Sequence, residues 1–192
     1  HSSTSLFAAL RKCVPSKEYK LSMWEHTGEK RPEFAEQPSA GQESVWDYPR
    51  PPILVISDAR VEVSHASVAI ATSKSALRVL ETASPPTYYL PEKDIDWRQL
   101  VKISQSSFCE WKGEASYYAL ASDPQQVPIA WLYANPSNSF AAIHRHASFY
   151  PGRVECRVNS EVVRPQPGKF YGGWITDRVR GPFKGEPGTG HW

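Results

Sequence analysis

Short stretches in which hydrophobic and polar residues alternate fill the middle of the chain, and this two-residue period predicts β-strands. Residues 60–63 and 68–72 lie on either side of a polar turn and predict a β-hairpin. Further strands are predicted at residues 87–90, 100–103, 107–111, 115–120, 129–133, 147–150, 154–158 and 161–163. Pro151 and Gly152 separate two of these strands and favour a second hairpin.

Helical periodicity is limited to short segments. Residues 73–82 are predicted to form a helix, because Ala76, Leu77 and Leu80 would make an apolar stripe on it. Residues 4–12 predict another short helix, and residues 139–144 predict a helical turn. The chain is therefore expected to fold as a compact, mostly β domain with one or two short helices, either a sandwich, a barrel or two sheets leaning together.

The two ends of the chain differ in composition from this middle part. Residues 1–45 are charged, show no sustained period, and are expected to form an N-terminal extension or linker. Residues 46–192 are expected to form a single β domain, which opens with a proline-rich, extended strap at residues 46–52. The tail, residues 164–192, is rich in glycine and proline, but its aromatic residues predict an ordered wrap against the domain.

Composition and charge narrow the class of protein. The 192 residues include 22 basic and 20 acidic side chains, and this net charge of +2 gives no general case for nucleic acid or a membrane as partner. No apolar run approaches the roughly 20 residues of a membrane helix, and we expect no signal peptide. Three cysteines, Cys13, Cys109 and Cys156, argue against a disulfide framework or a zinc ribbon and favour the cytoplasm. We expect no metal and no cofactor.

Several motifs occur in an order that resembles a known family. Four of them lie in the middle of the chain: PTYYLP at residues 86–91, SFCEWKG at 107–113, AWLY at 130–133 and FY at 149–150. Three more flank this part: VWDYPRPP at 45–52 before it, and FYGGWIT at 170–176 and GPFKG at 181–185 after it. Together they resemble the bacterial domain-of-unknown-function family four hundred and twenty-seven, and its longer cyanobacterial members, over roughly residues 45–192.

The resemblance implies a compact β fold in which two small sheets meet at an angle like a tent. Folds of this kind include zinc-binding modules, methionine sulfoxide reductases and ligand-binding domains with aromatic cages. The zinc versions carry paired Cys-x-x-Cys motifs, which this chain lacks, so structural zinc is not carried over. The family is sometimes labelled a nucleotidyltransferase domain, but the chain has neither a Gly-Ser beside spaced carboxylates nor a phosphate-binding glycine loop.

Aromatic residues on the predicted strands are the best candidates for a binding site. Alternation places Trp131 and Tyr133 on one face of their strand and gives Trp111 the same face as Cys109. With Tyr89, Tyr117 and Lys112 these rings predict an aromatic-walled pocket for a small ligand of cyclic or nucleotide-like type. The same rings are equally typical of a hydrophobic core.

Three residues are candidates for catalysis. Lys112 could lower the pKa of the Cys109 thiol and make it a nucleophile, although a free cysteine is often simply buried. Glu81 could act as a general base, or form a structural salt bridge with Arg60, Arg78 or Lys112. His144 and His146 would share a face on a strand, but no third ligand is apparent, so no metal site is predicted.

Three functions remain as alternatives. The first is a binding module for a small molecule, the second an enzyme that uses Cys109 or Glu81 with Lys112. The third is a protein-interaction module that uses the proline-rich strap or the N-terminal extension. The glycine-rich residues 181–190 either form an anion-binding nest or let the tail cross a sheet closely. No oligomeric state is predicted.

Overall fold

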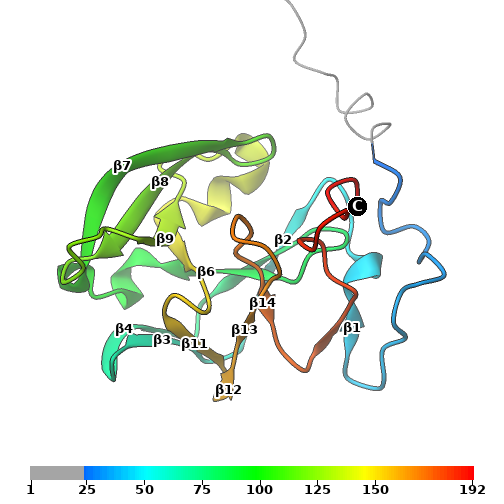
Figure 1. The fold of residues 1–192 in the computed structure, drawn as a ribbon, viewed down its shortest axis with the longest axis horizontal. Helices are drawn as coiled ribbons and strands as arrows, with labels where there is room; N and C mark the ends of the chain where they lie inside the picture. Colours follow the sequence, from blue (N-terminus) through cyan, green and yellow to red (C-terminus); the bar gives the residue numbers. More distant parts are fainter. Residues whose placement is uncertain (1–23) are drawn as a thin grey trace, which may run out of the picture.

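The computed structural model describes residues 24–192, which form two antiparallel sheets and two short strand pairs (Figure 1). The larger sheet runs in the order β2 (Ile53–Ile56), β5 (Leu77–Leu80), β6 (Thr87–Pro91), β10 (His146–Phe149), β9 (Pro128–Leu132), β8 (Gly113–Leu120) and β7 (Leu100–Cys109). The smaller sheet runs in the order β12 (Glu161–Val162), β11 (Glu155–Val158), β3 (Val61–His65) and β4 (Val68–Ser73). The prediction of a mostly β, two-sheet domain is confirmed, and the larger sheet is open, with β2 and β7 at its edges.

The main hydrophobic core lies between the two sheets. Val61 and Ile70 of the smaller sheet are fully or almost fully buried there, and Leu90 and Phe149 of the larger sheet are in the same cluster. Because side chains alternate along a strand, residues next to these point to the other face of the larger sheet. Tyr89, beside Leu90, belongs to a second buried cluster on that face. The larger sheet is therefore covered on both faces.

Within residues 24–192, four short 3-10 helices connect the strands: η1 (Val45–Asp47), η2 (Glu92–Asp94), η3 (Trp97–Gln99) and η4 (Asn138–Ile143). The helical turn predicted at residues 139–144 is confirmed by η4. The helix predicted at residues 73–82 is wrong, because this segment contains strand β5. Its apolar stripe has another cause: β5 is an interior strand buried on both faces, so its hydrophobic residues do not alternate. The helix predicted at residues 4–12 lies outside the described residues.

Strand boundaries show three further differences from the prediction. Strand β2 was not predicted, because four consecutive apolar residues after a proline pair show no period of two. The two strands predicted at residues 100–103 and 107–111 are one strand, β7, whose pairing with β8 shifts register between Lys102 and Ser106. Pro151 and Gly152 do not join a hairpin, since β10 and β11 belong to different sheets. The hairpin of β3 and β4 is confirmed.

The tail forms the ordered wrap that its aromatic residues predict. Strand β13 (Arg164–Pro165) pairs with β14 (Trp174–Ile175), and β15 (Val179–Arg180) pairs in parallel with β1 (Glu43–Ser44). The fully buried Trp174 donates its indole N–H to the carbonyl of Phe149 at 2.9 Å. The fully buried Trp46 donates to the carbonyl of Pro182 at 3.1 Å. Trp46 lies in η1, so the strap predicted to be extended over residues 46–52 begins instead with a 3-10 turn. These indoles fasten the tail to the larger sheet and to the strap.

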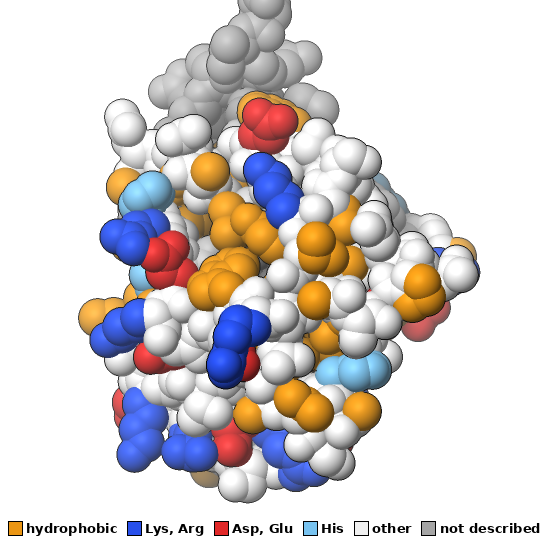
Figure 2. All heavy atoms as spheres, turned by 90° about the vertical axis from the view of Figure 1, so that its left-hand side faces the viewer, with side chains coloured by type: hydrophobic (Ala, Val, Ile, Leu, Met, Phe, Trp, Pro, Cys, Tyr) orange, Lys and Arg blue, Asp and Glu red, His pale blue; other side chains and the backbone are white. Residues whose placement is uncertain are grey.

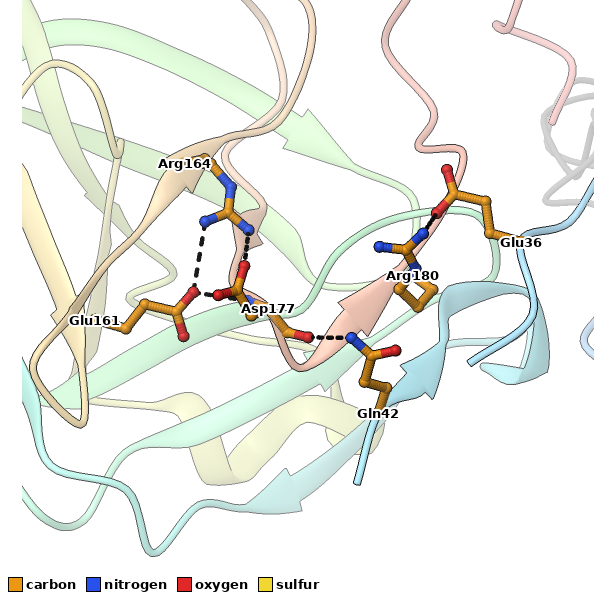
Figure 3. A network of polar contacts seen from close by, with 6 residues as sticks. All are labelled: Glu36, Gln42, Glu161, Arg164, Asp177 and Arg180. Atoms are coloured by element: carbon orange, nitrogen blue, oxygen red, sulfur yellow. Dashed lines mark hydrogen bonds and ion pairs between the residues drawn. The ribbon is translucent and has the colours of Figure 1, made fainter. Parts of the chain in front are cut away.

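Polar contacts on the surface add to this attachment (Figure 3). Arg164 binds the carboxylate of Asp177 at 2.9 Å, and the backbone N–H of Asp177 donates to Glu161 at 2.7 Å. Gln42 donates to the carbonyl of Asp177 at 2.7 Å, which links the N-terminal segment to the same turn. The network therefore crosses three parts of the chain that are far apart in sequence.

The outer surface of the β-rich part carries both signs of charge. Figure 2 shows the face at the left of Figure 1, where basic and acidic side chains are interspersed around a hydrophobic patch. Ion pairs between close neighbours contribute to this pattern elsewhere on the surface as well, for example Arg98 with Asp96 at 2.8 Å. No helix of residues 24–192 is long and apolar enough to cross a membrane.

A partly buried ion pair holds β1 against β5. Arg78 donates to both carboxylate oxygens of Glu43, at 2.7 and 3.3 Å, and the Tyr48 hydroxyl donates to the same group at 2.6 Å. Arg178 completes the set at 2.6 Å. Burial alone would raise the pKa of Glu43, but the bonds from Arg78 and Tyr48 outweigh it and lower the pKa from 4.5 to about 2. A carboxylate with a lowered pKa stabilises the fold above its unfolded-state pKa.

We predict that Glu43→Gln lowers the free energy of unfolding at pH 7 by about 3 kcal/mol, because it removes the charge that neutralises the buried Arg78. In the wild type, this stabilisation is fully present above pH 4.5 and is lost as the pH falls toward 2. Urea unfolding at pH 7, 4.5 and 3 measures both effects. The variant should lose less stability than the wild type over that range.

The control is Glu36→Gln, the same substitution at an exposed pair with Arg180, whose side chains are 45% and 44% exposed. Exposed pairs contribute little, so this variant should change the free energy of unfolding by less than about 1 kcal/mol. Equal losses for the two variants would contradict the assigned role of Glu43.

Candidate functional site

A cavity of about 230 Å³ opens on the face of the larger sheet that points away from the smaller sheet. Its aromatic walls come from the middle strands and the segments that follow them. They are Tyr89 of β6, Tyr117 of β8, Trp131 of β9, Tyr133 and Tyr150. The tail closes one side with Phe170, Tyr171 and Gly172. The cavity therefore lies between the larger sheet and the tail.

Strand alternation and register explain why these rings meet. In β8, Tyr118 and Leu120 pack toward the core between the sheets, so Tyr117 points to the opposite face. In β9, Ala130 and Leu132 face the core in the same way, and Trp131 points out. The register pairs Tyr117 directly with Trp131, which places the two rings side by side on one face.

Hydrogen bonds fix the polar ends of these rings. The Trp131 indole N–H donates to the Tyr89 hydroxyl at 3.1 Å, and the rings meet edge to face with centroids 6.3 Å apart. The hydroxyls of Ser107 and Tyr117 are 2.7 Å apart and share a hydrogen bond. Burial raises the pKa of Tyr89 and of Tyr133, so both phenols are neutral at physiological pH. The cavity thus offers hydroxyl groups in fixed positions.

Lys112 supplies a positive charge at the cavity wall. It lies in the turn between β7 and β8, where Ser137 binds the carbonyls of Trp111 and Lys112 at 2.6 and 3.0 Å. Its ammonium is 5.6 Å from the ring centre of Phe140 and 5.8 Å from that of Tyr133, within cation–π range. Burial alone would lower the pKa of Lys112, but Tyr89, Cys109 and Glu81 outweigh it and raise the pKa. The side chain is therefore charged at neutral pH.

Cys109 ends β7 and lines the cavity as a partly exposed thiol. Its sulfur lies close enough to Lys112 and Tyr133 to contribute to the raised pKa of both groups. Cys156 is different, because it is buried in the core between the sheets and burial raises the pKa of its thiol. Cys13 lies outside the described residues. Among residues 24–192, Cys109 is thus the accessible thiol.

Glu81 lines the cavity, but its partner is a residue that the sequence pattern did not predict. Arg50 Nε lies 3.3 Å from Glu81 Oε1, and the Arg50 side chain is completely buried. The pairing of Ile53 with Leu80 in β2 and β5 brings the residues before β2 beside those after β5. Arg50 also donates to the carbonyl of Thr82 at 2.8 Å. Glu81 is therefore held in a structural ion pair.

The tail contributes cavity residues that the sequence analysis did not single out. Gln166 accepts a hydrogen bond from the N–H of Gly173 at 3.0 Å and donates to the carbonyl of Lys184 at 2.7 Å. This side chain thereby holds two tail segments together beside the cavity. Gly172 lies so close to the ring of Trp131 that no Cβ fits between them. The aromatic content of the tail signalled its order, but no pattern indicated which sheet face it covers.

Two sequence candidates lie elsewhere. Trp111 is in the turn after β7 and packs against the aromatic cluster that includes the cavity walls, but it does not itself line the cavity. His144 and His146 each place a ring nitrogen 2.9 Å from a backbone carbonyl oxygen. In the described part of the chain, no group of three or more His, Cys, Asp or Glu residues could hold a metal ion.

Comparison with known protein families adds to this geometry. Residues 53–160, more than half of the chain, match the model named NTP_transf_9 and described as "Domain of unknown function (DUF427)". The chain belongs to the DUF427 family. No curated protein matches it.

The DUF427 match divides the cavity into two parts. The matched residues include strands β2 to β11, the residues of the aromatic walls, Cys109 and Lys112. Gln166, Phe170, Tyr171 and Gly172 come after residue 160 and lie outside the match. The walls therefore belong to the DUF427 domain, whereas the cover comes from the C-terminal tail.

We predict that Gly172→Ala lowers the free energy of unfolding by about 1–3 kcal/mol, because the added methyl group overlaps Trp131 Cη2 and must displace the tail or the ring. Thermal and urea unfolding measure the loss, and the tryptophan fluorescence should shift as the cover moves. The control is Gly190→Ala in the same tail, where an added Cβ meets nothing within 4 Å. A control that loses as much stability as Gly172→Ala would show that the Trp131 contact is not the cause.

Proposed function

We propose that this protein is a small-molecule binding module that holds a flat ring compound in the cavity. The observation that carries the proposal is the convergence of Tyr89, Tyr117, Trp131 and Tyr133 around one open space. Ligand sites are typically concave and apolar, with a few polar groups in fixed positions. Flat rings bind well between aromatic side chains, because the rings stack or meet edge to face.

The size of the cavity limits the ligand. Pockets for drug-sized ligands span roughly 300–1,000 Å³, and this one is smaller, at about 230 Å³. It therefore suits one ring system with a short substituent better than a dinucleotide. Phe108 and Phe170 line the opening and are 77% and 73% exposed. A bound ring that reached the opening would cover part of this apolar surface, which would favour binding.

The polar groups supply orientation. The hydroxyls of Ser107 and Tyr117 and the Lys112 ammonium reach the cavity from separate positions. Each is held by a neighbour, so little side-chain freedom would be lost when a ligand binds. A ring that carries acceptor atoms would therefore bind in one orientation.

The first test is a thermal-shift screen with nicotinate, nicotinamide, uracil, orotate and indole-3-acetate. A compound at 100 times its dissociation constant stabilises the fold by about 2.7 kcal/mol, which corresponds to a rise in Tm of roughly 5–10 °C for a chain of this size. Thr87→Trp, which places an indole in the cavity from β6, should abolish the shift. The control is Thr72→Trp, the same substitution at an exposed position of β4, which should bind as the wild type does.

Alkylation of Cys109 by iodoacetamide, located by peptide mass spectrometry, then identifies the site. A ligand in the cavity should slow the reaction at Cys109 in proportion to its occupancy. A compound that stabilises wild type and Thr87→Trp equally, without protecting Cys109, binds elsewhere. If no compound of the panel protects Cys109 at millimolar concentration, the proposed function is wrong.

A further inference from the structure

The charges around the cavity do not balance. Glu81 is the carboxylate that lines it, and this group is paired with the buried Arg50. Within residues 24–192, Lys112 forms no ion pair within 4 Å, although it lines the same cavity. The cavity thus has one carboxylate whose charge is already matched, and one ammonium without such a partner among the described residues.

A second lysine lies close to a residue of the cavity cover. Lys184 is only 7% exposed, and its ammonium donates to the carbonyl of Trp192 at 3.0 Å. It lies 5.9 Å from the ring centre of Tyr171, a cavity residue, and 4.6 Å from that of Trp24. Arg50 lies over the same Trp24 ring, at 4.1 Å from its centre, and burial together with the charge of Arg50 lowers the pKa of Lys184. Arg50 and Lys184 are thus two further cations near the cavity, with Glu81 and Glu110 as the carboxylates close to them.

The environment of Lys112 favours an anion over water as its partner. Its ammonium faces the rings of Tyr133 and Phe140, which attract a cation but cannot accept a strong hydrogen bond. An ammonium has three N–H donors, and the neighbouring Cys109 sulfur would be only a weak acceptor. A carboxylate that entered the cavity would satisfy the donors that remain and form a charge-assisted bond.

We infer that the ligand is a small planar acid whose anionic group binds the Lys112 ammonium while its ring lies against Trp131 and Tyr133. This inference rests on the proposed function and narrows its ligand class. The opposite end of such a ligand would face the opening between Phe108 and Phe170, so a neutral or apolar ring substituent fits there. A cationic ligand would be repelled by the Lys112 ammonium at the cavity wall.

The test compares acids with amides of the same ring and nearly the same shape. Dissociation constants of nicotinate and nicotinamide, and of benzoate and benzamide, are measured by titration calorimetry at pH 7.5. The wild type should bind each acid on the order of 10- to 100-fold more tightly than its amide. Lys112→Met keeps the length of the side chain without its charge, and should remove this preference while leaving amide binding within about threefold.

The matched control is Lys102→Met, the same substitution at an exposed position of β7. It should keep the full preference for acids. If Lys112→Met does not fold, Lys112→Gln is used in its place. The ratio of the dissociation constants of amide and acid is measured on the wild type alone, so this part of the test does not depend on any variant. Equal binding of acids and amides by the wild type, with Cys109 protected by both, would overturn the inference and leave the proposed function standing. Absence of protection by any of the four compounds would count against the proposed function itself.

Discussion

The two-residue alternation of β6, β8 and β9 is the constraint on which both the core and the cavity depend. One set of side chains, which includes Leu90 and Ala130, packs against the smaller sheet, and the other set forms the aromatic walls. A shift of register by one residue would exchange the two faces and put Trp131 into the core. The burial of the core therefore sets the strand register, and this register also determines which side chains form the cavity walls.

The tail and the N-terminal segment then decide what covers those walls. Gly172 lets the backbone approach the Trp131 ring more closely than any side chain would allow, and Gln166 holds that approach in place. Trp46 and Trp174 anchor the same tail to the strap and to the larger sheet. The Glu43 carboxylate ties β1 to Arg78, and β1 in turn pairs with β15 of the tail. The cover of the cavity is thus built from long-range contacts.

This division explains how much of the molecule could be predicted from the sequence. Local alternation was enough to predict most strands and to place Trp131 and Tyr133 on one face, because that information lies within a few residues. It failed at β5, where burial on both faces hides the period. It also failed at β2, an edge strand of four apolar residues in which Ile53 and Ile56 are exposed. Trp111 was assigned to a strand face, but β7 ends at Cys109, and strand ends are poorly marked by alternation. The residues of the tail that line the cavity depend on tertiary packing, which no local pattern encodes.

The same failure at β2 also hid the electrostatics of the site. Without β2, nothing in the sequence places Arg50 beside Glu81, and Glu81 then looks like a free carboxylate that could act as a base or pair with Lys112. The register of β2 with β5 changes this interpretation, because it brings a buried guanidinium to that carboxylate. Once Glu81 is neutralised by Arg50, the charge left at the cavity is that of Lys112. Among the described residues that line the cavity, an unpredicted edge strand thereby leaves Lys112 as the charge on which the proposed preference for an anion rests.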